Sequence, residues 1–265
     1  HAPNAGSRKS WAAGDATSRG VRLAMITMSG EMGYPGALSA PVWGFEDVLF
    51  KGDSLSLPQP FETYVMENIL FKISFPAEFH AQTAVEAAVS LHSEIKDRIN
   101  EIESIEITTH ESAIRIISKV GELNNPADRD HCLQYMVAIG LLKGNLVAED
   151  YEDDVAKDPR VDELREKMII NEDKRYSKEY LEADKRSIAN RIKVHFKDGT
   201  ATNEVEVEYP IGHKRRRKEG IPILEKKFKD NLSITYDESK SNEIFELCMD
   251  QRKLEETSVA DFQQL

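Results

Sequence analysis

Apolar residues cluster differently along successive parts of the chain, and the first cluster predicts a buried helix. Nearly every position between Val21 and Met28 is apolar, which is typical of a helix buried on all sides. Residues able to cap a helix occur near Gly14–Asp15, so we expect the helix to begin there. Three glycines and two prolines then predict turns from Gly30 to Pro41.

The pattern changes near Asn68, where strand and helix signals begin to alternate. Ile69–Phe75 reads as a strand, and an apolar stripe at helical spacing predicts a helix over His80–Ile99. Ile102–Thr109 alternates between apolar and polar residues, as a half-buried strand does. After a turn with proline, a further helix is expected from Asp128 to about Lys143.

The remainder of the chain combines a charged stretch, a hairpin and a return to helix. Residues 144–191 are rich in acidic and basic side chains and predict a solvated helical surface. Residues 190–196 and 204–209, joined through Asp198-Gly199, predict a β-hairpin. From Gly220 onward, apolar residues again recur at helical spacing.

This order of elements predicts an α+β fold with three segments. An all-helical domain formed by both chain ends would contain residues 1–68 and 211–265. An α/β insert of residues 69–210 would interrupt it, with a mixed sheet because a hairpin follows the helix–strand alternation.

Composition narrows the class of function. The chain has 265 residues, and 35 basic against 47 acidic residues give a net charge of −12, which disfavours nucleic acid or an anionic membrane as the partner. The longest apolar run, Tyr135–Leu142, is too short to cross a bilayer. Cys132 and Cys248 are too far apart in sequence to indicate a disulfide framework or a thiolate metal site.

Two short segments place cations or histidine beside a helix start. Arg8 and Lys9 precede the first apolar helix, where backbone donors and positive charge together favour a carboxylate or phosphate; a solvated surface loop is the alternative. Lys72 and His80 flank a proline turn. The helix N-terminus disfavours imidazolium, so His80 is available as a base, or it simply bonds to backbone.

Two further segments are ambiguous. His131 and Tyr135 are four positions apart and share a helix face, although a tyrosine in an apolar helix commonly serves the core. The basic run His213–Lys218 lacks neighbouring aromatic residues for base stacking, so we expect a solvated loop or a partial anion clamp there. Neither a phosphate-binding glycine loop nor a zinc spacing occurs in the sequence.

Long segments of the chain resemble the 2-methylcitrate dehydratase family, within the larger MmgE/PrpD group that includes cis-aconitate decarboxylase. They occur in family order and span nearly the whole chain. The matching segments are residues 6–19, 30–35, 64–68, 72–80, 124–131 and 208–213.

The resemblance implies an all-helical domain completed by both termini, an inserted α/β lid and a homodimer. It implies dehydration of 2-methylcitrate to 2-methyl-cis-aconitate in propionate breakdown, with no cofactor, metal or iron–sulfur cluster. Family members begin well upstream of His1. We therefore expect a missing N-terminal helical region, which would make this piece inactive alone.

The resemblance also assigns roles to single residues. Lys9 and Lys72 match lysines that stabilise substrate carboxylates, and Tyr135 matches a pocket tyrosine that assists the leaving hydroxyl. His80 is a fourth catalytic candidate, displaced because Glu78 stands where relatives carry histidine directly after Phe-Pro-Ala. Further candidates contact the substrate: Arg8, Arg129 and His131.

Other readings remain open at this stage. One alternative is a decarboxylase, or a dehydratase of citrate or aconitate, within the same family. The other alternative is a non-catalytic binding fragment that uses its acidic faces for protein contacts. The pathway favours the mitochondrial matrix in a eukaryotic source and the cytoplasm in a bacterial one.

Overall fold

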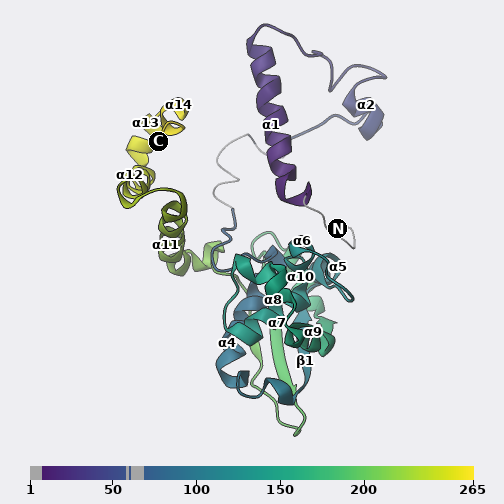
Figure 1. The fold of residues 1–265 in the computed structure, drawn as a ribbon. Helices are drawn as coiled ribbons and strands as arrows, with labels where there is room; N and C mark the ends of the chain where they lie inside the picture. Colours follow the sequence, from purple (N-terminus) through teal and green to yellow (C-terminus); the bar gives the residue numbers. More distant parts are fainter. Residues whose placement is uncertain (1–7, 58–59, 61–68) are drawn as a thin grey trace. The chain divides into compact units, whose positions relative to one another are not determined.

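The structure is a computed structural model that describes residues 8–57, 60 and 69–265. It divides into two compact units, one within residues 5–68 and the other over residues 69–265. Figure 1 shows the helices and strands of both units along the chain. Each unit is considered separately below.

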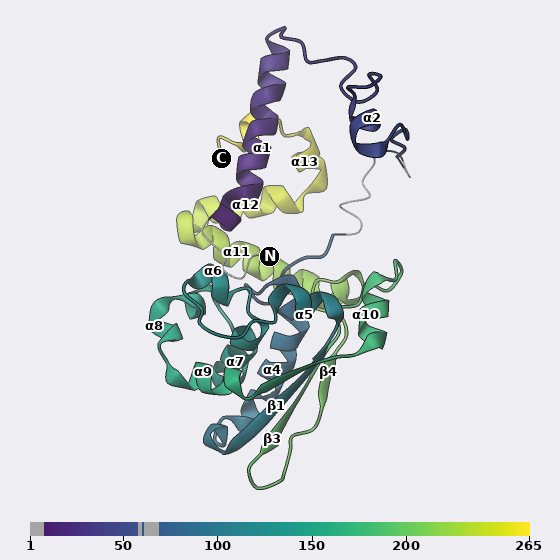
Figure 2. The same ribbon diagram turned by 90° about the vertical axis from the view of Figure 1, so that its right-hand side faces the viewer.

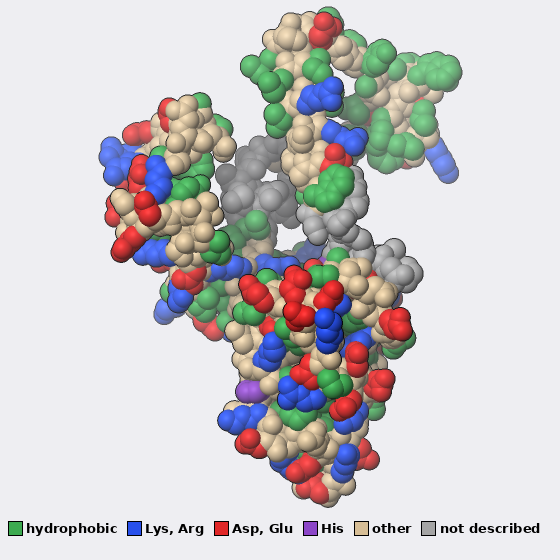
Figure 3. Space-filling model, viewed as in Figure 1, with side chains coloured by type: hydrophobic (Ala, Val, Ile, Leu, Met, Phe, Trp, Pro, Cys, Tyr) green, Lys and Arg blue, Asp and Glu red, His purple; other side chains and the backbone are tan. Residues whose placement is uncertain are grey.

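The first unit consists of two helices joined by turns. Its helices are α1 (Arg8–Met28) and α2 (Phe45–Phe50). The helix α1 begins earlier than the sequence predicted, and its apolar residues are exposed: Leu23 is 64% and Met25 65% accessible. Within its own unit this helix is therefore not buried on all sides as predicted, because α2 and the turns leave its apolar residues exposed. Figure 3 shows hydrophobic side chains, in green, on the surface of this unit.

A mixed four-stranded sheet forms the centre of the second unit, in the order β2-β1-β3-β4. Strand β1 (Ile102–Thr109) pairs in parallel with β2 (Met168–Glu172) and antiparallel with β3 (Asn190–Phe196). Strand β4 (Val205–Val207) completes the predicted hairpin with β3. The observed combination of helices and a small mixed sheet confirms the predicted α+β class.

Helices cover one face of this sheet. Helix α4 packs against β3, β4 and α7, and α7 also contacts α9, so the core lies between these helices and the strands (Figure 2). Alternate residues of β3 are buried, as expected for a sheet with one covered face. Around this core lie α4 (Gln82–Ile95), α5 (Glu111–Ile117), α6 (Pro126–Arg129), α7 (Leu133–Lys143), α8 (Asp153–Ala156), α9 (Pro159–Glu166) and α10 (Lys174–Leu181), with the 3₁₀ turns η1 (Phe79–Ala81), η2 (Ile99–Glu101) and η3 (Ala148–Tyr151).

Three predicted elements of this unit differ from the observed ones. Residues 69–75 form no strand; within this segment the Phe71 N–H donates to Gly212 O, in the loop before η4, and not to the sheet. The single helix expected from Asp128 is two helices, α6 and α7; the Asn125 side chain caps α6, and Pro126 occupies its first turn. The charged stretch at 144–191 contains strand β2, which lies at the edge of the sheet and is half-exposed; its apolar run, Met168–Ile170, is only three residues long.

Helices follow the hairpin, as the sequence predicted. The basic run at 213–218 is not a solvated loop: it forms η4 (Lys214–Arg216) and the start of α11. The Arg216 guanidinium forms two 2.9 Å hydrogen bonds with the carboxylate of Glu86 on α4 and bonds also to Glu219. The terminal helices are α11 (Arg217–Thr235), α12 (Glu238–Met249), α13 (Gln251–Glu256) and α14 (Val259–Phe262). Along the described residues, no helix combines the length and apolar content needed to cross a membrane.

Candidate functional site

The predicted lysines lie in different units. Lys9 and Arg8 occupy the first turn of α1, but their side chains lie outside the described residues. Lys72 is exposed in the segment that leads to the proline turn, and its carbonyl oxygen accepts a 3.0 Å hydrogen bond from Lys227 Nζ. The expected convergence of Lys9 and Lys72 on one substrate remains a prediction.

The proline turn places Glu78 and His80 in direct contact. Glu78 precedes η1 and its carboxylate accepts a 2.8 Å hydrogen bond from the His80 backbone N–H. The same carboxylate lies 2.9 Å from His80 Nδ1, and both side chains are only 12% exposed. The backbone of this turn is fixed from both sides: Gln82 Nε2 donates to the carbonyls of Phe75 and Ala77, and Asn190 Nδ2 donates to that of His80.

The other ring nitrogen of His80 contacts a tyrosine from a distant part of the chain. His80 Nε2 lies 3.0 Å from the hydroxyl of Tyr180 on α10. The Tyr180 ring stacks on the ring of His110, with centroids 4.6 Å apart and planes 12° from parallel. Helix α10 is held here because the hydroxyl of Ser177 accepts a 2.8 Å hydrogen bond from the Glu111 backbone N–H.

Glu78, His80, His110 and Tyr180 form what we call the His80 cluster. Electrostatic interactions determine the charge of two of these groups, Glu78 and His110. Burial alone would raise the pKa of Glu78, but hydrogen bonds and charge from His80 outweigh it and hold that pKa below its ordinary value. Burial, aided by repulsion from His80, lowers the pKa of His110 to about 4. At neutral pH the cluster therefore contains a Glu78 carboxylate and a neutral His110.

His131 belongs to the surroundings of Glu78. Its side chain is 10% exposed, and its Nδ1 bonds to the carboxylate of Asp130. The charge of His131 also lowers the pKa of Glu78, after the larger effects of burial and His80, and the Glu78 backbone N–H donates to Asp130 O at 3.3 Å. The structure thus brings two predicted residues, His80 and His131, to the same carboxylate.

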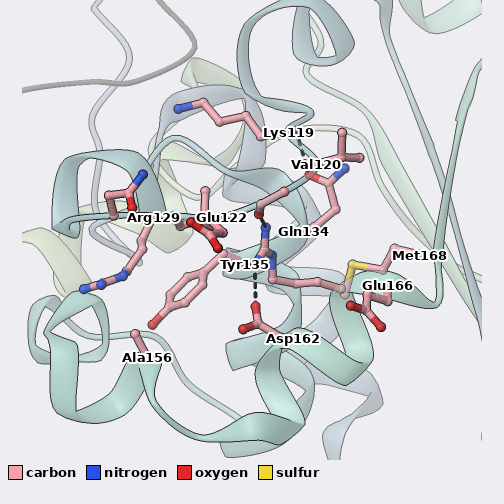
Figure 4. A pocket seen from close by; sticks show the side chains of 14 residues that line it. Lys119, Val120, Glu122, Arg129, Gln134, Tyr135, Ala156, Asp162, Glu166 and Met168 are labelled. Carbon is pink, nitrogen blue, oxygen red and sulfur yellow. Dashed lines mark hydrogen bonds and ion pairs between the residues drawn. The ribbon is translucent and has the colours of Figure 1, made fainter.

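Tyr135 and Arg129 lie together in a different place. The buried hydroxyl of Tyr135 donates a 2.6 Å hydrogen bond to Asp150 O, and burial raises its pKa to about 12. Arg129 is also buried, donates to Tyr151 O at 2.7 Å and pairs with the carboxylate of Asp153. Both residues line a pocket of about 590 Å³, shown in Figure 4.

The cations that line the pocket in Figure 4 are all paired with carboxylates, and Glu122 and Glu166 add further negative charge to the lining. Lys119 pairs with Asp128, Arg129 with Asp153 and Arg165 with Asp162. A substrate carboxylate would have to displace one of these acidic partners. The arrangement favours a structural ion-pair cluster around Tyr135 over an open anion site.

Sequence reasoning missed Tyr180 and His110. Tyr180 lies in the charged stretch to which no function was attached, and His110 follows β1 directly. The sequence signal available for His110 was its position between an alternating strand and the next helix, where helix-capping residues occur. In the structure its Nδ1 does cap that helix, accepting a 3.4 Å hydrogen bond from Ala113 N. No sequence signal linked Tyr180 to His80.

The Glu78–His80–Tyr180 arrangement is chemically suited to proton transfer. An imidazole bonded to a carboxylate on one side and a phenol on the other can accept or supply a proton at neutral pH. Among residues of described placement, no three His, Cys, Asp or Glu side chains are grouped as metal ligands would be.

Comparison with known proteins identifies the family. A family model described as the MmgE/PrpD C-terminal domain matches residues 75–251, and one described as the MmgE/PrpD N-terminal domain matches residues 1–58. The chain belongs to the MmgE/PrpD family. The resemblance predicted from the sequence is confirmed.

Curated members of the MmgE/PrpD family are similar to the chain over almost all of its length. The 2-methylcitrate dehydratase of Escherichia coli (strain K12) is 57% identical over 99% of this chain, which covers 55% of that protein. The protein of Yarrowia lipolytica named "2-methylcitrate dehydratase, mitochondrial" is 57% identical over 92% of the chain, covering 48% of its own length. The chain therefore spans about half the length of the curated relatives it matches.

Proposed function

We propose that the protein containing this chain is a hydro-lyase that dehydrates 2-methylcitrate to 2-methyl-cis-aconitate. The observation that carries the proposal is the 57% identity to the E. coli 2-methylcitrate dehydratase over 99% of the chain. Removal of water next to a carboxylate needs a base, an acid for the leaving hydroxyl, and cations for the substrate. The His80 cluster supports the acid–base part of this chemistry.

Residue roles are part of the same proposal. Lys9 and Lys72 bind and stabilise the substrate carboxylates, with Arg8 and His131 assisting, and His80 transfers a proton. Tyr135 assists the leaving hydroxyl, which requires its bond to Asp150 O to break. Arg129 would likewise have to exchange its partner Asp153 for a substrate carboxylate.

The proposal extends to assembly and location. Helices of residues 1–68 and 211–265 would belong to one helical domain, completed by an N-terminal region, with residues 69–210 inserted as a lid. The active form would be a homodimer. The location would be the mitochondrial matrix if the source is eukaryotic, and the name of the Yarrowia relative supports a mitochondrial location; a bacterial source would imply the cytoplasm.

A chimera tests the activity directly. In the E. coli relative, the segment matching this chain is replaced by the chain, and the purified protein is incubated with 2-methylcitrate, citrate and cis-aconitate. We expect a product of 2-methylcitrate that has lost one water, measured by mass spectrometry. The unmodified E. coli enzyme is the positive control, and circular dichroism establishes folding.

Other outcomes would contradict the proposal in defined ways. Loss of carbon dioxide from cis-aconitate would favour a decarboxylase, and preferential turnover of citrate or aconitate would favour a different dehydratase. A folded chimera that binds tricarboxylates by calorimetry without turnover would favour a binding protein.

A further inference from the structure

Both ring nitrogens of His80 are occupied by protein groups. The carboxylate of Glu78 lies 2.9 Å from Nδ1, and the hydroxyl of Tyr180 lies 3.0 Å from Nε2. A substrate can therefore exchange a proton with this imidazole in two ways. It displaces Glu78 or Tyr180 from the ring, or one of these two groups passes the proton between the substrate and the ring. Because the Glu78 carboxylate also accepts a hydrogen bond from the His80 backbone N–H, Tyr180 is the group able to pass a proton between the substrate and His80.

The contacts define the protonation of the ring. A carboxylate only accepts hydrogen bonds, so Nδ1 carries the proton toward Glu78. In the neutral ring Nε2 then has a lone pair, and the Tyr180 hydroxyl donates to it. Burial of Glu78 and His80, each 12% exposed, shields these bonds from water, whereas Tyr180 is half-buried and is the accessible end of the chain of bonds.

His110 gives the phenol a fixed position. Its ring lies parallel to that of Tyr180, and its Nδ1 is engaged with Ala113 N. A neutral His110 leaves the ring pair free of an extra positive charge. The hydroxyl of Tyr180 is thus directed by stacking on one side and by His80 on the other.

We propose that Tyr180 is the group through which His80 exchanges protons with the substrate, in a Glu78–His80–Tyr180 relay. This rests on the proposed function in taking the substrate to be a tricarboxylate that loses water. Tyr180 Oη takes the carbon-bound proton while its own proton passes to His80 Nε2. The C–H electron pair forms the double bond, and the C–O bond breaks with its pair leaving on the hydroxyl.

The cycle closes through the same groups. Tyr180 gives its proton to the departing hydroxide to form water, with Tyr135 assisting only by a hydrogen bond to that hydroxyl, and the His80 imidazolium returns its Nε2 proton to Tyr180. The Glu78 carboxylate stabilises the imidazolium in between. In this scheme Glu78 is a positioning residue.

The tautomer of His80 is measured in the 265-residue chain by nitrogen NMR at pH 8, above the ordinary pKa of imidazole. We expect a ring protonated at Nδ1 with an unprotonated Nε2. Tyr180→Phe should shift the Nε2 resonance, whereas Tyr176→Phe, one turn earlier on α10, should not. Protonation at Nε2 in the unmodified chain would overturn the relay without bearing on the substrate.

Kinetics in the chimera then separate the relay from direct action of His80. Tyr180→Phe keeps the ring stacked on His110, and we expect kcat to fall by about 100-fold or more with little change in KM. Tyr176→Phe is the matched control and should retain wild-type kcat. If His80 acts directly, Tyr180→Phe frees Nε2 and activity persists or rises, which would contradict the relay.

Discussion

The hydrogen-bonding state of a single side chain in this protein depends more on its neighbours in the fold than on its position in the sequence. His80 at a helix start has several possible roles, but a carboxylate at Nδ1 and a phenol at Nε2 leave one hydrogen-bonding state for the neutral ring. The neighbours of Tyr135 instead argue against a free catalytic hydroxyl, because its buried hydroxyl already donates a hydrogen bond to Asp150 O.

The lysine predictions are tested by truncation. Lys9→Ala and Lys72→Ala, made separately in the chimera, should each lower kcat/KM for 2-methylcitrate by about 100-fold or more, because each removes a charge opposite a substrate carboxylate. Lys96→Ala, an exposed lysine at the end of α4, is the control. Near-wild-type kinetics for either variant would refute the role of that lysine.

Buried histidines should make the chain less stable in acid. The pKa of His110 is lowered to about 4 by burial, and that of His213 to about 4 by burial and by the cations Arg215 and Lys214. The unfolded chain takes up protons near the ordinary pKa of 6.5, so stability is complete above that pH and is lost as the pH falls toward 4. The slope is at most about 1.4 kcal/mol per pH unit for each histidine.

His110→Asn isolates one of these contributions, because asparagine can still cap α5 but does not titrate. We expect the variant to lose less free energy of unfolding than the wild type between pH 6.5 and pH 5, measured by urea denaturation. Identical losses in the two proteins would show that His110 does not stay neutral when folded.

Connections between elements depend on close backbone approach as well as on helix and strand patterns. Gly212 has a φ of +102°, and a Cβ built there would lie 2.1 Å from the carbonyl oxygen of Phe71. The Phe71 N–H in turn donates to Gly212 O at 3.4 Å. This contact explains why residues 69–75 lie along the loop before η4 and not in the sheet.

Gly212→Ala should therefore be strongly destabilising. Gly199→Ala is the matched control, since Gly199 also has a positive φ, of +82°, but no atom lies within 4 Å of the added Cβ. We expect Gly199→Ala to cost about 1–2 kcal/mol of unfolding free energy and Gly212→Ala clearly more. Equal costs, measured by denaturant unfolding, would mean that the Phe71 carbonyl moves aside freely.

For the molecule as a whole, the exposed apolar residues of α1 point to association. Val21, Leu23 and Met25 are each more than 60% exposed, which is unusual for three neighbouring large apolar side chains. The proposed helical domain and the proposed homodimer would each supply protein surface to cover them.

Light scattering measures this association. We expect the chain to have a mass of at least twice its own 30.0 kDa at micromolar concentration. Leu23→Ser should weaken the association, and Arg22→Ser at the neighbouring position should not. A mass of 30.0 kDa throughout would contradict self-association of this chain.

Local patterns in the sequence were sufficient for the elements whose burial repeats regularly. The apolar stripe of α4, the alternation of β1 and the Asp198-Gly199 turn between β3 and β4 are local signals, so these elements and the α+β class followed from residue spacing. The family followed from long matching segments. Edge strand β2 and the break between α6 and α7 escaped because partial exposure and side-chain capping leave little periodic signal.

The chemistry of the site required the folded chain. Tyr180 is 100 residues from His80, and no spacing rule relates them; helix α10 brings them together through its contacts with α5. Likewise, the guanidinium of Arg216 in the basic run is hydrogen-bonded to the carboxylate of Glu86, 130 residues away, and is not simply solvated. Hydrogen bonds between distant segments depend on how the helices pack on the sheet, which residue spacing along the chain does not specify.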